Sequence, residues 1–370
     1  MKRVRFLILG GFLGAGKTTA IARLARRYID RGLKVAIVTN DQAYGLVDTQ
    51  SLEAQGLNVG EVTGACFCCK FDDLVATAAR LSADEQPDVI LAEPVGSCTD
   101  LAATVAEPLA QLYGDRYDVG PLGVLLKPEH GRKILGGSDD VGFSPKAAYI
   151  FLKQLEEADV IAINKIDKLS SVQRQDLLRL VGQRFPGKKV LAISARRGDA
   201  LDALEQALSA PAAKRTRTPE VDYDIYAEGE AELGWLNCTV RLTAGDKRKP
   251  FSLDEVVLEL VVRLREACAM DDAEPAHLKV FGTAEGESSL ANLVSSDVGA
   301  ELSLASEAKV AEAELTVNAR VAIDPARLSE LVQREAKALA TKHGLSVEMA
   351  NVQSFRPGRP VPTHRMAVGQ

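Results

Sequence analysis

The sequence contains little cysteine, with six residues in a chain of 370. That number excludes a disulfide-stapled scaffold, and with no secretory signal it favours reduced thiols and a cytosolic location. An excess of positive charge is also lacking: the formal net charge is −6, which argues against DNA or RNA as a partner. Hydrophobic residues make up 46% and charged residues 26%, the balance of an ordinary globular protein with room for two domains.

Long apolar runs are absent as well. The first residues, MKRVRFLILGGFLGAG, join basic residues to an apolar stretch as a signal peptide does. Lys17 interrupts this stretch and three arginines follow by position 27, so the run is too short to span a bilayer. We interpret it as a buried strand and expect no membrane partner.

Residues 1–208 alternate short apolar runs with helical stretches. The runs are nearly continuous in apolar character, which is typical of strands covered on both faces. The pattern therefore predicts an α/β domain with a mostly parallel sheet flanked by helices. The expected strands are Phe6–Leu9, Val35–Val38, Val89–Leu91, Val124–Leu126, Val160–Ile163 and Val190–Ile193. A linker rich in Ala, Pro and Arg is expected at residues 209–225.

Residues 226–357 follow a different pattern, in which alternating strands enclose two helical stretches. A capping-box signature begins the first helix at Ser252, and Asp324–Pro325 begins the second. The order β-α-β-β-α-β predicts a smaller α+β domain of the ferredoxin-like type. Residues 283–310 are expected to form a long, partly polar connection, and residues 358–370 an extended tail.

The residues GFLGAGKT, from Gly11 to Thr18, match the phosphate-loop pattern G-x-x-x-x-G-K-[ST] between a strand and a helix, which predicts a P-loop NTPase. Glycines let backbone N–H groups curl toward phosphate oxygens, and the positive end of the next helix adds to the attraction. Lys17 is expected to reach the outer phosphates and the Thr18 hydroxyl to ligate Mg²⁺. The alternative is a plain glycine-rich turn. The candidate nucleotide-binding residues here are Gly14, Ala15, Gly16, Lys17, Thr18 and Thr19.

The sequence VIAINKID, which ends at Asp167, predicts a buried strand followed by a base-recognition motif. A carboxylate there can accept both N1–H and N2–H of guanine, and adenine offers no such pair of donors. The lysine stem can cover the base, and a backbone N–H after the next strand could meet the guanine O6. The alternative is a turn that caps the following helix. The candidate base-binding residues are Asn164, Lys165, Asp167, Ser194 and Ala195.

Three acidic residues are expected near the terminal phosphate. Glu93 follows a buried strand and precedes Pro-Val-Gly, where an acid can hold Mg²⁺ through a water or steer the attacking water. Asp41 ends the second strand, and Asp48 lies in a loop that could move with nucleotide state. The alternatives are a helix-entry loop at Glu93 and solvated loop acids at the other two. The candidate catalytic residues are Lys17, Glu93 and Asp48, and the Mg²⁺-side residues are Thr18, Glu93 and Asp41.

Half of the cysteines fall within four positions, at Cys66, Cys68 and Cys69. Cys66 and Cys68 would share a face of an extended strand, and a turn after Cys68 would bring Cys69 round to them. Three convergent thiolates select Zn²⁺ or Cu(I) over Mg²⁺ or Ca²⁺, and an open fourth position suits metal transfer. Redox pairing and buried packing are the alternatives. The other three cysteines are expected to be small core residues, although Cys98 lies near the terminal-phosphate strand.

With these motifs in this order, the first 200 residues resemble the CobW-type GTPases, which are grouped with the HypB and UreG metallochaperones in the SIMIBI class. The resemblance implies a GTPase that uses GTP or GDP with Mg²⁺, and that carries a transition metal, Zn²⁺ or Co²⁺, on its cysteine motif. GTP hydrolysis would then govern metal delivery. The resemblance also gives Glu93 the Mg²⁺-side role and implies a smaller C-terminal domain.

The chain departs from the family pattern at several places. Ala65 separates Gly64 from Cys66, where the family usually has G-C-x-C-C. The stretch 40–42, Asn-Asp-Gln, is more similar to HypB and UreG than to the N-E-F-G of CobW relatives, and Leu-Lys-Pro at 126–128 replaces Val-Asp-Ala. Four scattered histidines provide no metal-buffering tail. The resemblance therefore does not identify the client.

The sequence predicts a cytosolic GTPase that loads a transition metal, or a metal-containing cofactor, into a client metalloprotein or corrinoid enzyme. A homodimer is one expected assembly. Hydrolysis is expected to be slow without metal or a partner, because no arginine finger lies near the motifs. One rival is an interaction protein in which GTP switches docking, or a reactivating chaperone for a corrinoid enzyme. Another is a kinase-like phosphotransferase, which needs an acceptor pocket that the sequence does not show.

Overall fold

The chain folds as two compact units. The first unit comprises residues 1–42, 56–229 and 359–370, and the second comprises residues 43–55 and 230–358. The structure, a computed structural model, describes residues 2–44, 46–83, 86–136, 144–246, 248–293 and 299–366. The last four residues of the predicted tail lie outside the described residues.

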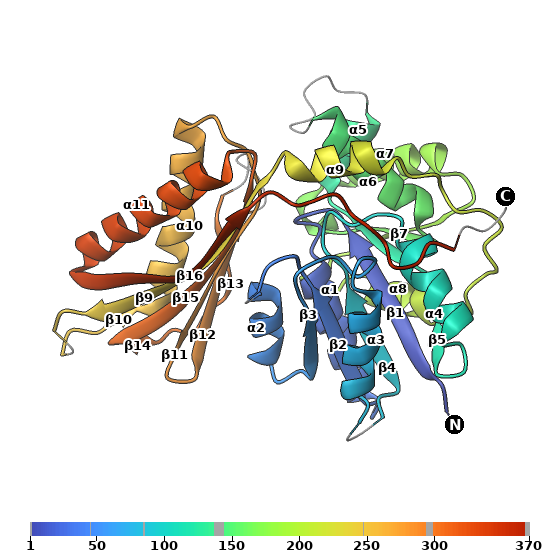
Figure 1. The fold of residues 1–370 in the computed structure, drawn as a ribbon, viewed down its shortest axis with the longest axis horizontal. Coiled ribbons are helices and arrows are strands. Elements are labelled where there is room, and N and C mark those ends of the chain that lie inside the picture. Colours follow the sequence, from blue (N-terminus) through green and yellow to red (C-terminus); the bar gives the residue numbers. More distant parts are fainter. Residues whose placement is uncertain are drawn as a thin grey trace. The chain divides into compact units, whose positions relative to one another are not determined.

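The first unit contains a parallel sheet with the strand order β3-β2-β4-β1-β6-β7-β8, in which β5 also pairs with β1 (Figure 1). Because neighbouring strands run in the same direction, the loops that follow β1, β2, β3 and β4 lie at one edge of the sheet. The strands are β1 (Val4–Gly11), β2 (Val35–Asn40), β3 (Val59–Val62), β4 (Val89–Glu93), β5 (Tyr117–Val119), β6 (Gly123–Leu126), β7 (Val160–Ile163) and β8 (Lys189–Ala192).

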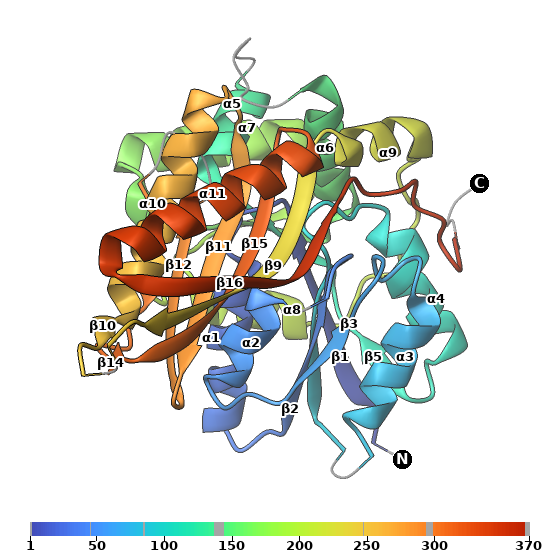
Figure 2. The same ribbon diagram turned by 60° about the vertical axis from the view of Figure 1, so that its left-hand side comes forward.

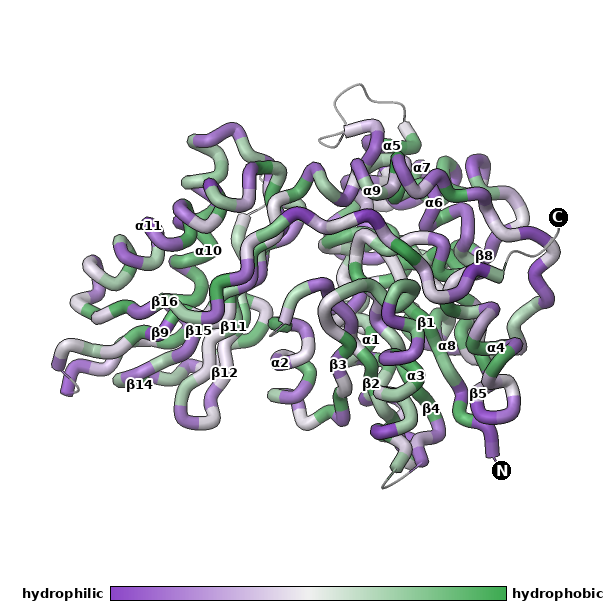
Figure 3. Tube along the Cα trace, viewed as in Figure 1, coloured by the Kyte–Doolittle hydropathy of each residue, from purple (hydrophilic) through white to green (hydrophobic). Residues whose placement is uncertain are grey.

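The central strands are almost fully buried, which confirms the predicted parallel sheet with covered faces. Figure 3 shows β1, β2 and β4 as hydrophobic segments, and Phe6 to Leu9 are at most 1% exposed. Strands β3 and β5 escaped prediction because an acidic residue, Glu61 in β3 and Asp118 in β5, interrupts each short apolar run.

Helices connect these strands and pack against the sheet. Among the described residues, none is both long enough and apolar enough to cross a membrane. Residues 211–222 have no regular structure, but the predicted linker then continues into a helix. The helices are α1 (Lys17–Asp30), α3 (Phe71–Arg80), η1 (Ala102–Ala106), α4 (Glu107–Leu112), α5 (Pro128–Leu135), α6 (Pro145–Glu157), η2 (Ile166–Lys168), α7 (Ser171–Arg184), α8 (Leu201–Ser209) and α9 (Tyr223–Ala231).

The second unit is built on an antiparallel sheet with the order β13-β12-β11-β15-β9-β16. Helices α10 (Leu253–Met270) and α11 (Pro325–His343) share one hydrophobic core with it and cover one face (Figure 2). The succession β9-α10-β11-β15-α11-β16 confirms the predicted β-α-β-β-α-β order. The strands are β9 (Gly234–Ala244), β10 (Phe251–Ser252), β11 (Pro275–Ala284), β12 (Glu287–Leu293), β13 (Glu301–Leu304), β14 (Lys309–Val310), β15 (Glu312–Val321) and β16 (Leu345–Phe355).

The expected polar connection at 283–310 is instead largely strand. It contains β12, β13 and β14, and β12 pairs with β11 as a hairpin. Leu293 is buried on β12, whereas Glu287 at its start is exposed. Strand β13 lies at the edge of the sheet and has no fully buried side chain, so its sequence carries too few apolar residues to be recognised.

Helix α2 (Val47–Glu53) stands between β2 and β3 in the sequence but packs on the second unit's sheet. Val47 contacts Phe281, and its N–H donates to Asn318 Oδ1 at 2.9 Å. Val280, the neighbour of Phe281, lies in the core with α10 and α11, and successive strand residues face opposite sides. Helix α2 therefore covers the face opposite those two helices.

Candidate functional site

The phosphate loop follows β1 and leads directly into α1. Gly14 and Gly16 have positive φ values of 72° and 89°, a conformation that glycine adopts without strain. A Cβ on Gly16 would lie 2.5 Å from Asn164 Nδ2, so a larger residue does not fit there. The buried Lys17 donates from Nζ to Gly11 O at 3.0 Å. The loop is a tight curl at the amino end of a helix, which is the geometry that binds phosphate groups.

Two of the three residues expected on the Mg²⁺ side are brought together. Thr18 Oγ1 donates a hydrogen bond to Glu93 Oε1 at 3.0 Å, and Glu93 is only 5% exposed. A hydroxyl and a carboxylate side by side are the hard oxygen ligands that suit Mg²⁺. A Cβ on Gly96, three residues after Glu93, would lie 3.1 Å from Lys17 Nζ, so the loop after β4 lies against the phosphate-binding lysine.

Asn164 connects the phosphate loop to the end of β8. Its Nδ2 donates to Ala15 O at 2.8 Å, and its Oδ1 accepts from the Ala195 N–H at 2.9 Å. The sequence suggested that Asn164 reads the base and that an N–H near Ala195 meets the guanine O6. In the structure these two groups bond to each other, so Asn164 ties the two loops together, and the contacts of Asn164 and Ala195 with a base stay predictions.

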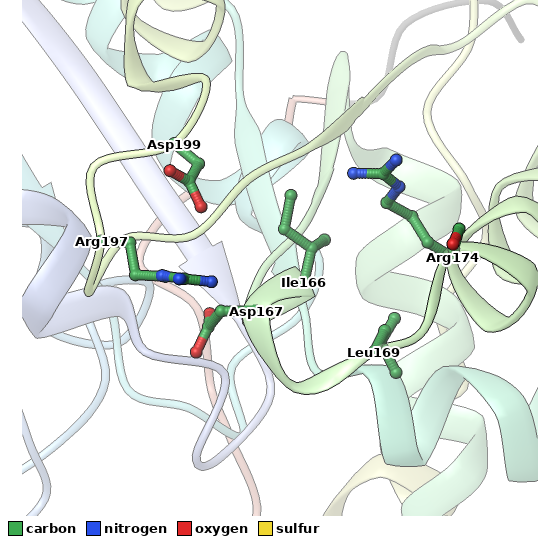
Figure 4. Close-up of a pocket in the computed structure, with 7 residues that line it drawn as sticks. Ile166, Asp167, Leu169, Arg174, Arg197 and Asp199 are labelled. Atoms are coloured by element: carbon green, nitrogen blue, oxygen red, sulfur yellow. The ribbon is translucent and has the colours of Figure 1, made fainter.

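Asp167 lies at the base end of the site, where its Oδ1 accepts from Ser194 Oγ at 2.6 Å. It borders a hollow of about 270 Å³ that the close-up view displays (Figure 4). Arg197 and Arg174 also border this hollow, on opposite sides, and sequence reasoning missed both because neither belongs to a recognisable motif. The lining residues are Ile166, Asp167, Leu169, Ser171, Arg174, Arg197 and Asp199. Carboxylate acceptors and guanidinium donors together suit a planar base with both kinds of hydrogen-bonding group.

The three clustered cysteines lie in a tight turn between β3 and α3. The N–H groups of Cys69 and Lys70 both donate to Cys66 O at 3.0 Å. The turn therefore begins at Cys66, and the predicted extended strand with a turn after Cys68 is wrong. The Cys66 Sγ lies 2.8 Å from that of Cys68 and 3.3 Å from that of Cys69, and the remaining pair is 3.8 Å apart. The sulfurs converge as a shared ligand set requires.

Hydrogen bonds among these thiols lower the pKa of one of them and raise the pKa of the other two. Hydrogen bonds with the Cys68 and Cys69 thiols lower the pKa of Cys66 well below its ordinary value. The same contacts with Cys66 raise the pKa of Cys68, and they raise the pKa of Cys69 to about 11. A metal binds thiolates, so its binding must release the protons that Cys68 and Cys69 hold, and metal affinity rises with pH.

Asn40, the last residue of β2, fixes the cysteine turn. Its Nδ2 donates to Val62 O at 2.9 Å and to Ala65 O at 2.8 Å, and its Oδ1 accepts from the Phe67 N–H at 2.8 Å. The next residue, Asp41, donates its N–H to Val62 O at 3.2 Å. The strand end that the sequence assigned to the Mg²⁺ side thus also holds the thiols in place. In the sequence, the one sign of this role is that an asparagine ends a strand whose other residues are mostly apolar.

Asp48 belongs to the second unit. It lies on α2, and its carboxylate accepts a hydrogen bond from Lys279 of β11. The sequence could not show this ion pair, because the partner is more than 200 residues away. The catalytic role of Asp48 stays a prediction.

The C-terminal segment 359–366, here called the strap, crosses the cysteine turn within the first unit. The Val361 N–H donates to Cys69 Sγ at 3.2 Å, and the Thr363 N–H donates to Cys68 O at 2.8 Å. Further along, Arg365 Nε donates to Asp100 Oδ2 at 2.7 Å. Residues 359–366 of the predicted tail thus cover the thiols.

Deletion of residues 359–370 is expected to expose Cys69 to solvent reagents. The strap makes at least three hydrogen bonds to the turn and its neighbourhood, each of about 1 kcal/mol, so labelling should accelerate at least about tenfold. Reaction with a thiol reagent, read as the rate per cysteine by mass spectrometry, measures the change. Deletion of residues 367–370 alone is the control, and equal rates for parent and longer deletion would contradict the shielding.

Glu157, the last residue of α6, holds the loop after β4. It accepts hydrogen bonds from Thr99 Oγ1 at 3.0 Å and from the Ala102 N–H at 2.8 Å. Burial raises its pKa to about 8, and nearby Asp100 acts in the same direction, while the hydrogen bonds and Arg215 oppose the shift. Glu157 therefore tends to hold a proton below neutral pH.

Replacement of Glu157 by Gln is expected to remove the loss of folding stability that the parent shows as the pH rises. Because the folded-state pKa is raised from 4.5 to about 8, the folded chain binds the extra proton, and stability falls as the pH rises through this range. The melting temperature of Glu157→Gln relative to the parent should rise between about pH 5 and pH 8, by about 2–4 °C per kcal/mol. Thermal unfolding of both proteins, with Glu156→Gln as control, measures the trend, and a difference independent of pH would contradict it.

The parallel sheet, the glycine-rich loop between β1 and α1, and the buried lysine together define a P-loop nucleotide-binding protein. Residues 5–191, half of the chain, match the CobW/HypB/UreG nucleotide-binding domain family, and the chain belongs to this family. The resemblance found in the sequence is thereby confirmed.

Several characterised proteins are similar to this chain. The zinc chaperone CobW from Sinorhizobium sp is 25% identical over 222 residues, which are 53% of this chain and 60% of the relative. The zinc chaperone YeiR from Escherichia coli (strain K12) is 29% identical over 178 residues, 46% of this chain and 49% of the relative. The chain thus spans about half the length of these relatives. Against the Zn(II)-bound YjiA GTPase from E. coli, the alignment covers 92% of this chain and 99% of that one, with 13% identity and a TM-score of 0.38.

Proposed function

We propose that this protein is a GTP-dependent metallochaperone. It binds GTP or GDP with Mg²⁺ in its first unit, holds Zn²⁺ or Co²⁺ on Cys66, Cys68 and Cys69, and delivers the metal or a metal cofactor to a client protein. The observation that carries this proposal is the convergence of three thiols in a turn that Asn40 ties to the end of β2, at the phosphate-loop edge of the sheet. The names of two relatives, both zinc chaperones, favour zinc.

The nucleotide and Mg²⁺ fit the residues present. Lys17 and the loop N–H groups are the groups for the phosphates, Thr18 and Glu93 for Mg²⁺, and Asp167 for guanine. The bound nucleotide supplies a terminal phosphate whose presence or loss distinguishes two states of the protein. Hydrolysis is slow without metal or a partner, because the motifs include no arginine finger.

The metal site and the nucleotide site are coupled through β2 and β4, which are neighbours in the sheet. Asn40 ends β2 and fixes the thiol turn, while Gly96 follows β4 and lies against Lys17. A nucleotide that shifts either strand end shifts the ligands of the metal. By linkage, the metal must change nucleotide affinity by the same factor.

The client is a metalloprotein or a corrinoid enzyme, and the site needs a reducing compartment such as the cytoplasm to keep its thiols free. The alternative function is a GTP-switched interaction protein, or a reactivating chaperone for a corrinoid enzyme, in which the thiols carry no cargo.

Anaerobic titration of the reduced full chain with Co²⁺ and Zn²⁺ tests the proposal. The titration is run without nucleotide, with GDP, and with a non-hydrolysable GTP analogue. We expect one metal per chain, sulfur-to-cobalt charge-transfer absorption, and affinities that differ between the two nucleotide states by about 5–150-fold. Absence of metal binding in every state would favour the interaction protein.

A further inference from the structure

The loop after β4 brings a fourth cysteine to the cysteine turn. Cys98, only 1% exposed, forms side-chain hydrogen bonds with the thiols of both Cys66 and Cys68. The sulfurs of Cys66, Cys68 and Cys69 all lie within 4.8 Å of one another, and Cys98 contacts two of these three. Four of the chain's six cysteines therefore gather at one place, although the fourth comes from a different strand end.

The two remaining cysteines show what ordinary core packing looks like in this protein. Cys238 and Cys268 lie in the hydrophobic core of the second unit, among leucine and valine side chains. Burial is the single cause that raises the pKa of Cys238, whereas the sulfur contacts of Cys98 act on two other thiols. Cys98 is buried as expected of a small core residue, but it also contacts other sulfurs, which that expectation did not include.

Helix α6 holds the Cys98 loop firmly. Gln154 Nε2 donates to Gly96 O at 3.0 Å and to Cys98 O at 2.8 Å, and the Cys98 N–H donates to Val95 O at 3.0 Å. The buried Gln154 side chain thus holds the backbone on both sides of Ser97, and this backbone positions the fourth sulfur.

The spacing of the three clustered sulfurs is close to that of a zinc thiolate site. At a Zn–S distance of about 2.3 Å, the sulfurs of a tetrahedral site are about 3.8 Å apart. The separations among Cys66, Cys68 and Cys69 are 2.8, 3.3 and 3.8 Å, so these three ligands need to spread by at most about 1 Å to receive the ion. A set of four thiolates selects Zn²⁺ strongly over Mg²⁺ or Ca²⁺.

We propose that Cys98 is the fourth protein ligand of the metal, and that it makes the site a closed four-sulfur site coupled to the phosphate loop. This inference rests on the proposed metal site at the cysteine turn. Cys98 stands two residues after Gly96, which lies against Lys17. A shift of this loop with the terminal phosphate would withdraw or supply one sulfur, converting a closed site into one open for transfer.

X-ray absorption of the zinc-loaded, reduced full chain counts the sulfur ligands directly. Four sulfurs are expected in the parent and three in Cys98→Ser, with an affinity for Zn²⁺ that falls by at least about tenfold, since even outer-shell changes cost 10–100-fold. Cys98→Ala guards against an effect of the serine hydroxyl, and Cys268→Ala is the matched control. Circular dichroism verifies that each variant folds.

The outcomes separate this inference from the proposed function. Three sulfurs in the parent, with unchanged affinity in Cys98→Ser, would overturn the role of Cys98 and leave the three-thiol carrier intact. A parent that binds no zinc in any nucleotide state would overturn the metal site as a whole. Four sulfurs without nucleotide but three with the GTP analogue would support the coupling directly.

Discussion

An Asp167→Asn variant is expected to bind guanine nucleotides about a hundredfold to ten-thousandfold more weakly than the parent. The Asp167 carboxylate borders the base-end hollow and is the group that can accept N1–H and N2–H of guanine together. A hydrogen bond to a charged group contributes about 1.5–3 kcal/mol, and two of them are lost or reversed. Asparagine would turn one acceptor into a donor that faces the guanine N2–H.

Displacement of a fluorescent GDP analogue by GDP, ADP and xanthosine diphosphate measures the change. Xanthine carries a carbonyl where guanine has its amino group, so the variant should regain affinity for the xanthine nucleotide. Asp176→Asn, which changes an exposed carboxylate on α7, is the control and should keep its preference for GDP. If Asp167→Asn bound GDP as tightly as the parent, the base would lie elsewhere.

The parts of the site that the sequence predicted are those encoded by consecutive residues. Lys17 and Thr18 belong to one loop whose curl is dictated by its own glycines, and the cysteines at 66, 68 and 69 meet through a single turn. Even there, the predicted position of the turn, after Cys68, was wrong. Periodicity predicts whether a segment is extended, but hydrogen bonds to Cys66 O decide where the chain bends.

The parts that the sequence did not predict depend on contacts between distant residues. Asn40 fixes the cysteine turn because β2 and β3 are neighbours in register, which no local pattern specifies. Cys98 reaches the same turn through the order of β4 in the sheet, and Val361 reaches it from the far end of the chain. Helix α2 packs on the second unit although its sequence neighbours belong to the first. Each follows from tertiary packing.

Cys66→Ser is expected to cause the largest loss of metal affinity of any single cysteine change. The Cys66 sulfur lies 2.8 Å from that of Cys68 and 3.3 Å from that of Cys69, the two shortest separations in the cluster. Hydrogen bonds with these two thiols lower the pKa of Cys66, so it is the first thiolate a metal meets. Zinc sites built from four ligands contribute about 10–16 kcal/mol, or about 2.5–4 kcal/mol per ligand. Loss of one central ligand should therefore weaken Zn²⁺ binding by about a hundredfold to a thousandfold.

Competition with a chromophoric zinc chelator measures this loss, with Cys268→Ala in the second unit as control. The pH dependence supplies an independent check. In the parent, protons on Cys68 and Cys69 must leave when metal binds, so affinity rises steeply with pH. Cys66→Ser removes the thiolate that holds those protons by hydrogen bonding, and the remaining thiols should release them at lower pH. The variant should therefore bind more weakly, and its affinity should level off at a lower pH than that of the parent, whereas levelling at the same pH would mean that Cys66 does not organise the cluster.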